Sequence, residues 1–256
     1  MAGPVLLRGG VVIDGTGGPR YVADVRVRDG RISEIGVNLT ACGESEIDVA
    51  GRIVAPGFID VHTHDDQMVL ASPKMLPKIS QGVTTVVVGN CGISLAPLVH
   101  DNVPPPLNLL GGTDKHVFPT MGSYARAVDD ARPAVNVVAL VGHSTLRVAT
   151  MADPYRPATT AEQARMVALI SEAMDAGAAG LSTGVFYAPG AAADVGRDLV
   201  AAAPRLHAAA SADDAPAACA PRPAGSSSAT RGSNPCRSST PTPSRCHSPT
   251  PRRTGS

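Results

Sequence analysis

Three β-branched apolar runs, separated by helical segments, constrain the fold of this 256-residue chain more than any other feature. The runs cover residues 58–62, 83–88 and 135–141 and contain few charged side chains. Nearly continuous apolar strands are typical of a parallel sheet that is buried on both faces. A further short strand is expected at residues 179–182. The order of elements therefore predicts an α/β fold with βα repetition, either a (β/α)₈ barrel or a doubly wound sheet.

The segment that follows residue 159 predicts a helix. Thr160 lies three residues before Gln163, which is the spacing of a capping box, and Gly177 would end the helix. Apolar side chains recur between them at helical spacing: Met166, Leu169, Ile170, Ala173 and Met174. By contrast, the connection from Gly89 to about Met121 predicts a long loop. Long loops in this setting usually cover a site at the C-terminal ends of the strands.

Residues 4–54 predict short strands joined by tight turns, because Asp-Gly and Gly-Gly pairs separate the apolar runs. The expected strands cover residues 5–7, 11–13, 23–27 and 31–35. The chain is thus expected to have three parts: a small β-sheet domain at 1–54, βα repeats at 55–195, and an irregular tail at 196–256.

The tail is predicted from its composition. From Gly196 onward the chain holds nine of its 23 prolines and contains no Ile, Met, Phe or Tyr. Such a segment cannot bury enough apolar surface to offset its chain entropy, so we expect it to be disordered. GC-rich codons read out of frame give a similar composition, and a one-base shift lets the codons for residues 213–217 encode Thr-Thr-His-Leu-Arg. A natural disordered tail is the alternative.

Charge and cysteine content exclude several classes of protein. Lys plus Arg and Asp plus Glu both number 22, so no global field favours binding to nucleic acid or to an acidic membrane. The N-terminus lacks the long apolar segment of a signal peptide, and no stretch reads as a membrane span. The five cysteines are odd in number and widely spaced, which argues against a disulfide framework. We therefore expect a cytoplasmic protein.

Two histidines at the end of the first apolar strand are the sharpest candidates for chemistry. His62 and His64 are two residues apart, so on a strand their side chains point the same way. Two neutral imidazoles aimed at one point form half of a zinc site. Pro56-Gly57 precedes the pair and Asp65-Asp66 follows it, which strengthens the interpretation as a metal site.

Other polar residues follow the neighbouring strands. Cys91, between Asn90 and Gly92, is either a buried structural thiol or a thiolate ligand beside the histidines. His143 comes after the third strand, where it could orient a loop or a substrate oxygen as readily as bind a metal. No Gly-x-Ser-x-Gly motif is present, so a serine nucleophile has no support.

Several of these segments resemble one known family. Ala-Pro-Gly-Phe-Ile-Asp-Val-His-Thr-His at 55–64 resembles the first barrel strand of the amidohydrolase superfamily. The segments at 81–97, which includes Gly-Asn-Cys-Gly, and at 141–147 and 180–190 resemble the N-acyl-D-amino-acid deacylases (D-aminoacylases) within it. The resemblance covers about residues 4–195. It implies the N-terminal half of a (β/α)₈ barrel that follows a small β-sheet domain.

The resemblance also implies a metal centre. In this family the His-x-His pair binds a catalytic zinc ion, and the cysteine after the second strand is a further ligand, so His62, His64 and Cys91 are the expected ligands. The hydantoinase and dihydroorotase group instead bridges two metals with a carboxylated lysine from the fourth strand. The chain's three lysines, Lys74, Lys78 and Lys115, all lie far from that strand.

The implied activity is zinc-dependent hydrolysis of the amide bond in a small N-acyl-D-amino acid. Zinc would polarise the acyl carbonyl and activate a water molecule. Phe186 and Tyr187 would line the pocket for the amino-acid side chain, and His143 would contact substrate. The family's remaining metal histidines and its general base come from later strands and match no residue here, so we expect this chain to be truncated and inactive. A hydantoinase-like enzyme and a non-catalytic fragment are the alternatives.

Overall fold

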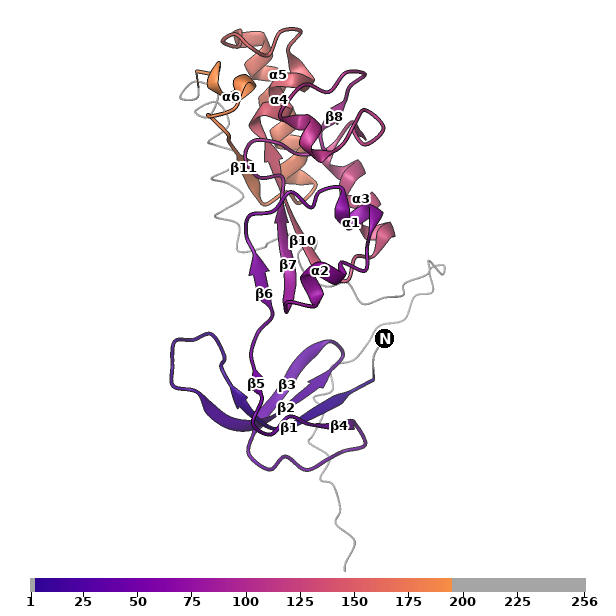
Figure 1. Cartoon of the computed structure of the whole chain (residues 1–256), viewed down its shortest axis with the longest axis vertical. Helices are drawn as coiled ribbons and strands as arrows, with labels where there is room; N and C mark the ends of the chain where they lie inside the picture. The colour runs from indigo at the N-terminus through magenta and orange to yellow at the C-terminus, as the bar shows by residue number, and fades with distance from the viewer. Residues whose placement is uncertain (1–2, 195–256) are drawn as a thin grey trace, which may run out of the picture. The chain divides into compact units, whose positions relative to one another are not determined.

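The computed structural model describes residues 3–194, which divide into two compact units between Pro56 and Gly57 (Figure 1). The predicted irregular tail at 196–256, with its out-of-frame reading, lies outside the described residues. Within residues 3–194, no helix has the length and apolar character needed to cross a membrane.

The first unit is a five-stranded sheet. Its strands are β1 (Val5–Val12), β2 (Tyr21–Arg28), β3 (Arg31–Gly36), β4 (Ser45–Asp48) and β5 (Ile53–Val54), in the order β3-β2-β1-β4, with β5 also paired to β1. The predicted strands at 5–7 and 11–13 are parts of one strand, β1. A bulge at Gly9 shifts its pairing register with β2 without interrupting the strand. Gly9 has a φ of 66°, and its N–H donates to Asp24 Oδ1 at 2.8 Å. The bulge therefore lets a single strand pair along its whole length.

The second unit contains a four-stranded parallel sheet. Its strands are β6 (Phe58–Asp60), β7 (Val83–Val88), β10 (Asn136–Gly142) and β11 (Gly180–Ser182), in the order β11-β10-β7-β6. The predicted βα repetition is confirmed. The prediction that every strand is buried on both faces is wrong for β6, because Phe58 is 67% exposed and Ile59 is 60% exposed. In the part of the chain that the structure describes, β6 is an edge strand and pairs only with β7.

Six helices accompany this sheet within residues 3–194: α1 (Met68–Ala71), α2 (Leu76–Ile79), α3 (Met121–Ala131), α4 (His143–Thr150), α5 (Thr160–Asp175) and α6 (Ala188–Ala191). The predicted helix α5 is present, but its capping box is formed by Thr159 and Glu162, not by Thr160 and Gln163. Glu162 accepts the Thr159 N–H at 2.8 Å and also pairs with both terminal nitrogens of Arg156, at 2.7 and 2.9 Å. Gln163 could not form that ion pair, so the register with Glu162 is preferred.

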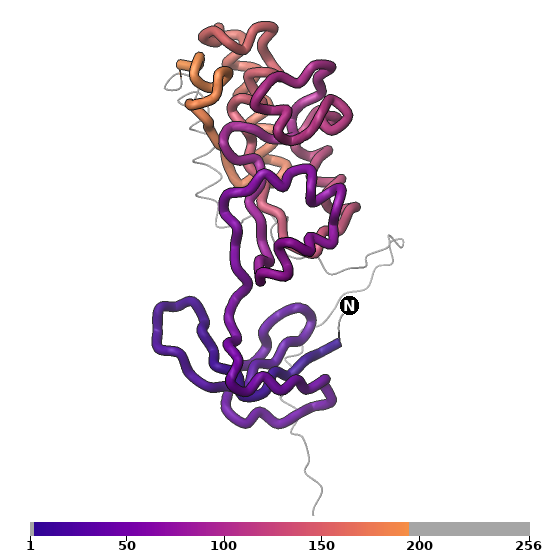
Figure 2. The backbone as a smooth tube through the Cα atoms, in the orientation of Figure 1, coloured from indigo at the N-terminus to yellow at the C-terminus, as the bar shows by residue number. Residues whose placement is uncertain are grey.

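The connection after β7 is more structured than the predicted loop. It contains a short antiparallel pair, β8 (Leu98–Val99) with β9 (Val117–Phe118), and a 3₁₀ helix at Leu107–Leu110. Figure 2 traces the backbone of this connection as a tube. Its apolar side chains join the main core, among them Ile93, Leu95, Leu98, Leu107 and Leu110. The burial of these side chains orders the segment. The sequence did not predict it, because these residues follow neither strand nor helix periodicity.

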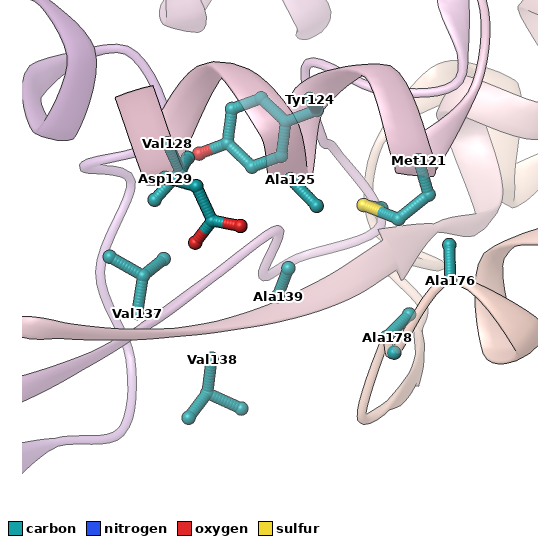
Figure 3. A pocket seen from close by; sticks show the side chains of 11 residues that line it. Met121, Tyr124, Ala125, Val128, Asp129, Val137, Val138, Ala139, Ala176 and Ala178 are labelled. Carbon is teal, nitrogen blue, oxygen red and sulfur yellow. The ribbon is translucent and has the colours of Figure 1, made fainter. Parts of the chain in front are cut away.

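Helix α3 packs over β10. Figure 3 shows Val137 and Ala139 on the side of β10 that faces α3, with Val138 on the opposite side. A cavity of about 80 Å³ remains between α3 and β10. Its lining consists mostly of small apolar side chains, together with the Asp129 carboxylate. None of the predicted site residues lines this cavity, so it is a gap in packing and is separate from the candidate site.

Candidate metal centre

His62, His64 and Cys91 converge in the structure. One ligating atom from each lies within 4.8 Å of the others, and His62 Nε2 is 3.0 Å from Cys91 Sγ. The reason is topological: β6 and β7 are parallel neighbours, so the segments that follow them leave the sheet at the same edge. Within residues 3–194, no other group of three or more His, Cys, Asp and Glu residues has this arrangement.

The two histidines reach this point from a loop, which corrects the expected strand geometry. Strand β6 ends at Asp60, before His62. The Asp60 carboxylate accepts the His62 N–H at 3.3 Å, and the Thr63 N–H donates to the Val87 carbonyl at 3.4 Å. These bonds turn the backbone out of the strand while keeping both imidazoles together. Their ring centroids are 5.9 Å apart, with an interplanar angle of 74°.

The loop that carries Cys91 is tied to the histidine loop. Asn90 Nδ2 donates to the Val87 carbonyl at 2.8 Å and to the Thr63 carbonyl at 3.4 Å. The Gly89 N–H donates to Asp66 Oδ2 at 3.2 Å. Asp66 is buried, and this burial raises the pKa of its carboxyl group to about 7. The two ligand-bearing segments thus form one hydrogen-bonded unit.

Cys91 itself adopts an unusual backbone conformation. Its φ is +55°, in the left-handed region that non-glycine residues rarely occupy. Glycines allow the neighbouring loops to approach closely: a Cβ atom on Gly184 would lie 2.0 Å from the Cys91 carbonyl oxygen, and one on Gly142 would lie 2.6 Å from the Gly92 carbonyl. The Gly92 N–H also donates to Ser182 Oγ at 3.0 Å. The ends of β10 and β11, and the turn after β11, therefore hold the cysteine loop in place.

A lysine that the sequence did not single out lies on the other side of the histidine loop. Lys78 Nζ is 2.6 Å from Asp60 Oδ2 and 3.0 Å from Asp65 Oδ2. The hydrogen bond from Lys78 lowers the pKa of Asp60. In the sequence, the one sign of this contact is the position of Lys78 shortly before the apolar run at 83–88.

The donor set fits zinc. Partial loss of hydration around His64, followed by repulsion from His62, lowers the pKa of His64 and favours the neutral imidazole that binds metals. Two imidazole nitrogens and one thiolate sulfur are ligands that zinc prefers, at distances of about 2.0–2.3 Å. Small movements of the side chains would bring the three donor atoms to those distances from one ion.

The remaining candidates lie on adjacent segments. His143 is buried and is the first residue of α4, directly after β10. Phe186 and Tyr187 follow β11, with ring centroids 5.7 Å apart. Phe186 is 90% exposed, whereas Tyr187 is half-buried beside the close approach of Gly184 to Cys91. All three residues thus follow strands at the same edge of the sheet as the metal candidates.

Comparisons with known proteins show which proteins this chain resembles. A model of the amidohydrolase family matches residues 45–219, which extends past the expected end of the resemblance at about residue 195. The chain is 54% identical over 188 residues to an N-acyl-D-aspartate deacylase of Alcaligenes xylosoxydans xylosoxydans, covering 73% of this chain and 38% of that protein.

Solved structures show the same relationship. The crystal structure of a D-aminoacylase matches with a TM-score of 0.77 and 49% identity, covering 80% of this chain and 43% of that one. An N-acyl-D-glutamate deacylase from Bordetella bronchiseptica, complexed with zinc and a phosphonate inhibitor, matches with a TM-score of 0.75, 47% identity and the same coverage.

These matches identify the parallel sheet of the second unit as the first half of an amidohydrolase-type barrel, as predicted. The chain spans about two fifths of the length of these relatives. The family match covers well over half of the chain. The chain belongs to the amidohydrolase family.

Proposed function

We propose that this chain forms the N-terminal part of a zinc-dependent N-acyl-D-amino-acid deacylase, with His62, His64 and Cys91 as metal ligands. The convergence of their three donor atoms within 4.8 Å carries the proposal. The relatives support it, because the D-amino-acid deacylases among them are about half identical to this chain. The expected division into a small β domain at 1–54 and a half barrel at 55–195 is part of the same proposal.

The described fourth strand favours a deacylase over a hydantoinase-like enzyme. β11 consists of Gly180, Leu181 and Ser182 and offers no lysine that could be carboxylated to bridge two metals. Cys91, in the loop that follows β7, lies beside the two histidines. We therefore propose that its thiolate would serve as a metal ligand in place of such a lysine.

Bound zinc would polarise the acyl carbonyl and activate water for attack on the amide. The chain's own residues prepare this chemistry: the neutral His64 imidazole is ready to bind, and Asn90 and Asp66 hold the two ligand loops together. His143 is proposed to contact the substrate, and Phe186 and Tyr187 are proposed to line its side-chain pocket. Exposure of Phe186 leaves its ring available for that contact.

Metal content tests the ligand assignment. The 256-residue chain is loaded with zinc, desalted and measured by inductively coupled plasma mass spectrometry. We expect Cys91→Ala and His62→Ala to lose bound zinc, because each removes one of three donors. Cys42→Ala is the matched control, since Cys42 is an exposed cysteine in the first unit. Equal zinc content in Cys91→Ala and Cys42→Ala would refute the assignment.

A chimera tests the activity. Residues of this chain that align with the D-aminoacylase of Alcaligenes xylosoxydans xylosoxydans, 52% identical over 189 residues, replace the corresponding segment of that enzyme. We expect the chimera to hydrolyse N-acetyl-D-amino acids and its Cys91→Ala variant to lose most of that activity. A folded, zinc-loaded chimera that cleaves hydantoins and leaves N-acetyl-D-amino acids intact would favour the alternative.

A further inference from the structure

We propose that Lys78 is a positioning residue for the metal centre: its ammonium group fixes both ends of the loop that carries His62 and His64. This inference rests on the proposed metal-binding function. It assigns a role to a side chain that does not itself touch the three donor atoms.

The contacts of Lys78 span the loop. Its Nζ lies 2.6 Å from Asp60 Oδ2, at the last residue of β6, and 3.0 Å from Asp65 Oδ2, directly after His64. It also donates to Thr63 Oγ1 at 3.4 Å, in the middle of the loop. The Lys78 ammonium group therefore bridges Asp60 and Asp65, which stand on either side of the two histidines.

The first of these contacts continues to a ligand. Asp60 uses its other carboxylate oxygen, Oδ1, to accept the backbone N–H of His62 at 3.3 Å. Lys78 fixes the orientation of that carboxylate, and the carboxylate fixes the backbone from which the His62 imidazole projects. Hydrogen bonds between charged groups are stronger than neutral ones, so this chain of contacts restrains the loop more firmly than loop packing alone.

Lys78 is itself well supported. It lies in α2, which follows Met75, a residue that is 1% exposed and has a φ of 45°. After α2, the Gly82 carbonyl accepts the Phe58 N–H at 2.9 Å, which ties the start of β7 to the start of β6. The lysine side chain is 22% exposed, and those of Asp60 and Asp65 are 30% and 18% exposed. The three charged groups are thus partly shielded from water, where their attraction is less screened.

The loop is also held by hydrogen bonds from the segment that follows β7. Asn90 donates to the Thr63 carbonyl, and Gly89 donates to Asp66. These bonds would keep the loop folded when Lys78 is replaced. Without the ammonium group, however, the carboxylates of Asp60 and Asp65 would no longer be held at one point, and the loop between them could widen. We therefore expect loss of metal affinity in a chain that still folds.

The test is a cobalt titration of the full 256-residue chain, because Co²⁺ replaces zinc in such sites and gives a thiolate charge-transfer band. We expect Lys78→Met to weaken Co²⁺ binding about 10- to 100-fold, the usual effect of removing a group that orients ligands. Lys78→Arg keeps the cation and should restore binding to within about threefold of the original chain. Lys115→Met is the matched control, since Lys115 pairs at 2.8 Å with its neighbour Asp114 in the connection after β7.

Each outcome decides the matter. Unchanged Co²⁺ affinity in Lys78→Met overturns the proposal. If the unfolding temperature of the metal-free chain falls while the affinity is unchanged, the ion pair has only a structural role. If Lys78→Met fails to fold, Asp65→Asn takes its place. That variant removes one of the two ends, and we expect threefold or greater weakening; unchanged binding again overturns the proposal. Absence of Co²⁺ binding by the original chain would instead overturn the proposed metal-binding function.

Discussion

Replacement of Gly184 by alanine should disturb the metal centre from outside its ligand set. A Cβ atom at this position would lie 2.0 Å from the carbonyl oxygen of Cys91 and 2.8 Å from its carbonyl carbon. Both atoms belong to the backbone, so no side-chain rotation relieves the contact. Real Cβ atoms essentially never approach within 3.0 Å, and the Cys91 backbone must therefore move by about 1 Å.

The magnitude follows from how narrowly metal ligands are placed. Donor atoms in functional sites lie within about 0.2 Å of their ideal distance, so a movement of about 1 Å is well outside the tolerated range. We expect zinc affinity to fall at least about tenfold, which lowers the zinc-dependent stabilisation by about 1.4 kcal/mol. Overpacking should also destabilise the metal-free chain by about 1–3 kcal/mol.

Two measurements separate these effects. Competition with a chromophoric chelator gives the zinc affinity, and thermal unfolding with and without zinc gives the two stabilities. Gly180→Ala, in the strand that precedes Gly184, is the control, because its Cβ would meet only Leu140 Cδ2, at an ordinary 3.7 Å. The reasoning would be refuted if Gly184→Ala and Gly180→Ala had the same zinc affinity and the same stability without metal.

Two further predictions concern acid stability and turnover. The bidentate bond from Arg156 lowers the pKa of Glu162 from 4.5 to about 2, so its contribution to stability is present above pH 4.5 and disappears as the pH falls toward 2. Glu162→Gln should therefore be less stable at pH 7 but approach the original chain at pH 2–3, and equal destabilisation at both pH values in urea unfolding would contradict this. We also expect the 256-residue chain to hydrolyse N-acetyl-D-methionine at least about 100-fold more slowly than the chimera, because the described residues supply only four barrel strands and a barrel site is assembled from the ends of several strands. Comparable turnover per bound zinc would contradict that expectation.

The parallel sheet and the residues that could bind metal are both predictable from the amino-acid sequence. β-Branched runs identify strands without tertiary information, because their buried faces demand apolar side chains along the whole strand. His62, His64 and Cys91 were singled out because they follow such strands, and parallel strands end at one edge. The hydrophobic spacing of α5 is equally local, although its cap was assigned one residue too late.

The way in which the ligand residues are held depends on contacts between distant segments of the chain. The histidines project from a loop whose shape depends on Asp60, Val87 and Lys78, and the last two of these belong to other elements. No periodicity in the sequence marks such contacts, because each is a single hydrogen bond or ion pair between distant segments. The same holds for the loop of Cys91, which the glycine at the end of β10 and the glycine after β11 approach closely. The identity of the donor atoms depends on residue type and can be read from the sequence. Their geometry arises only when separate segments of the chain pack together.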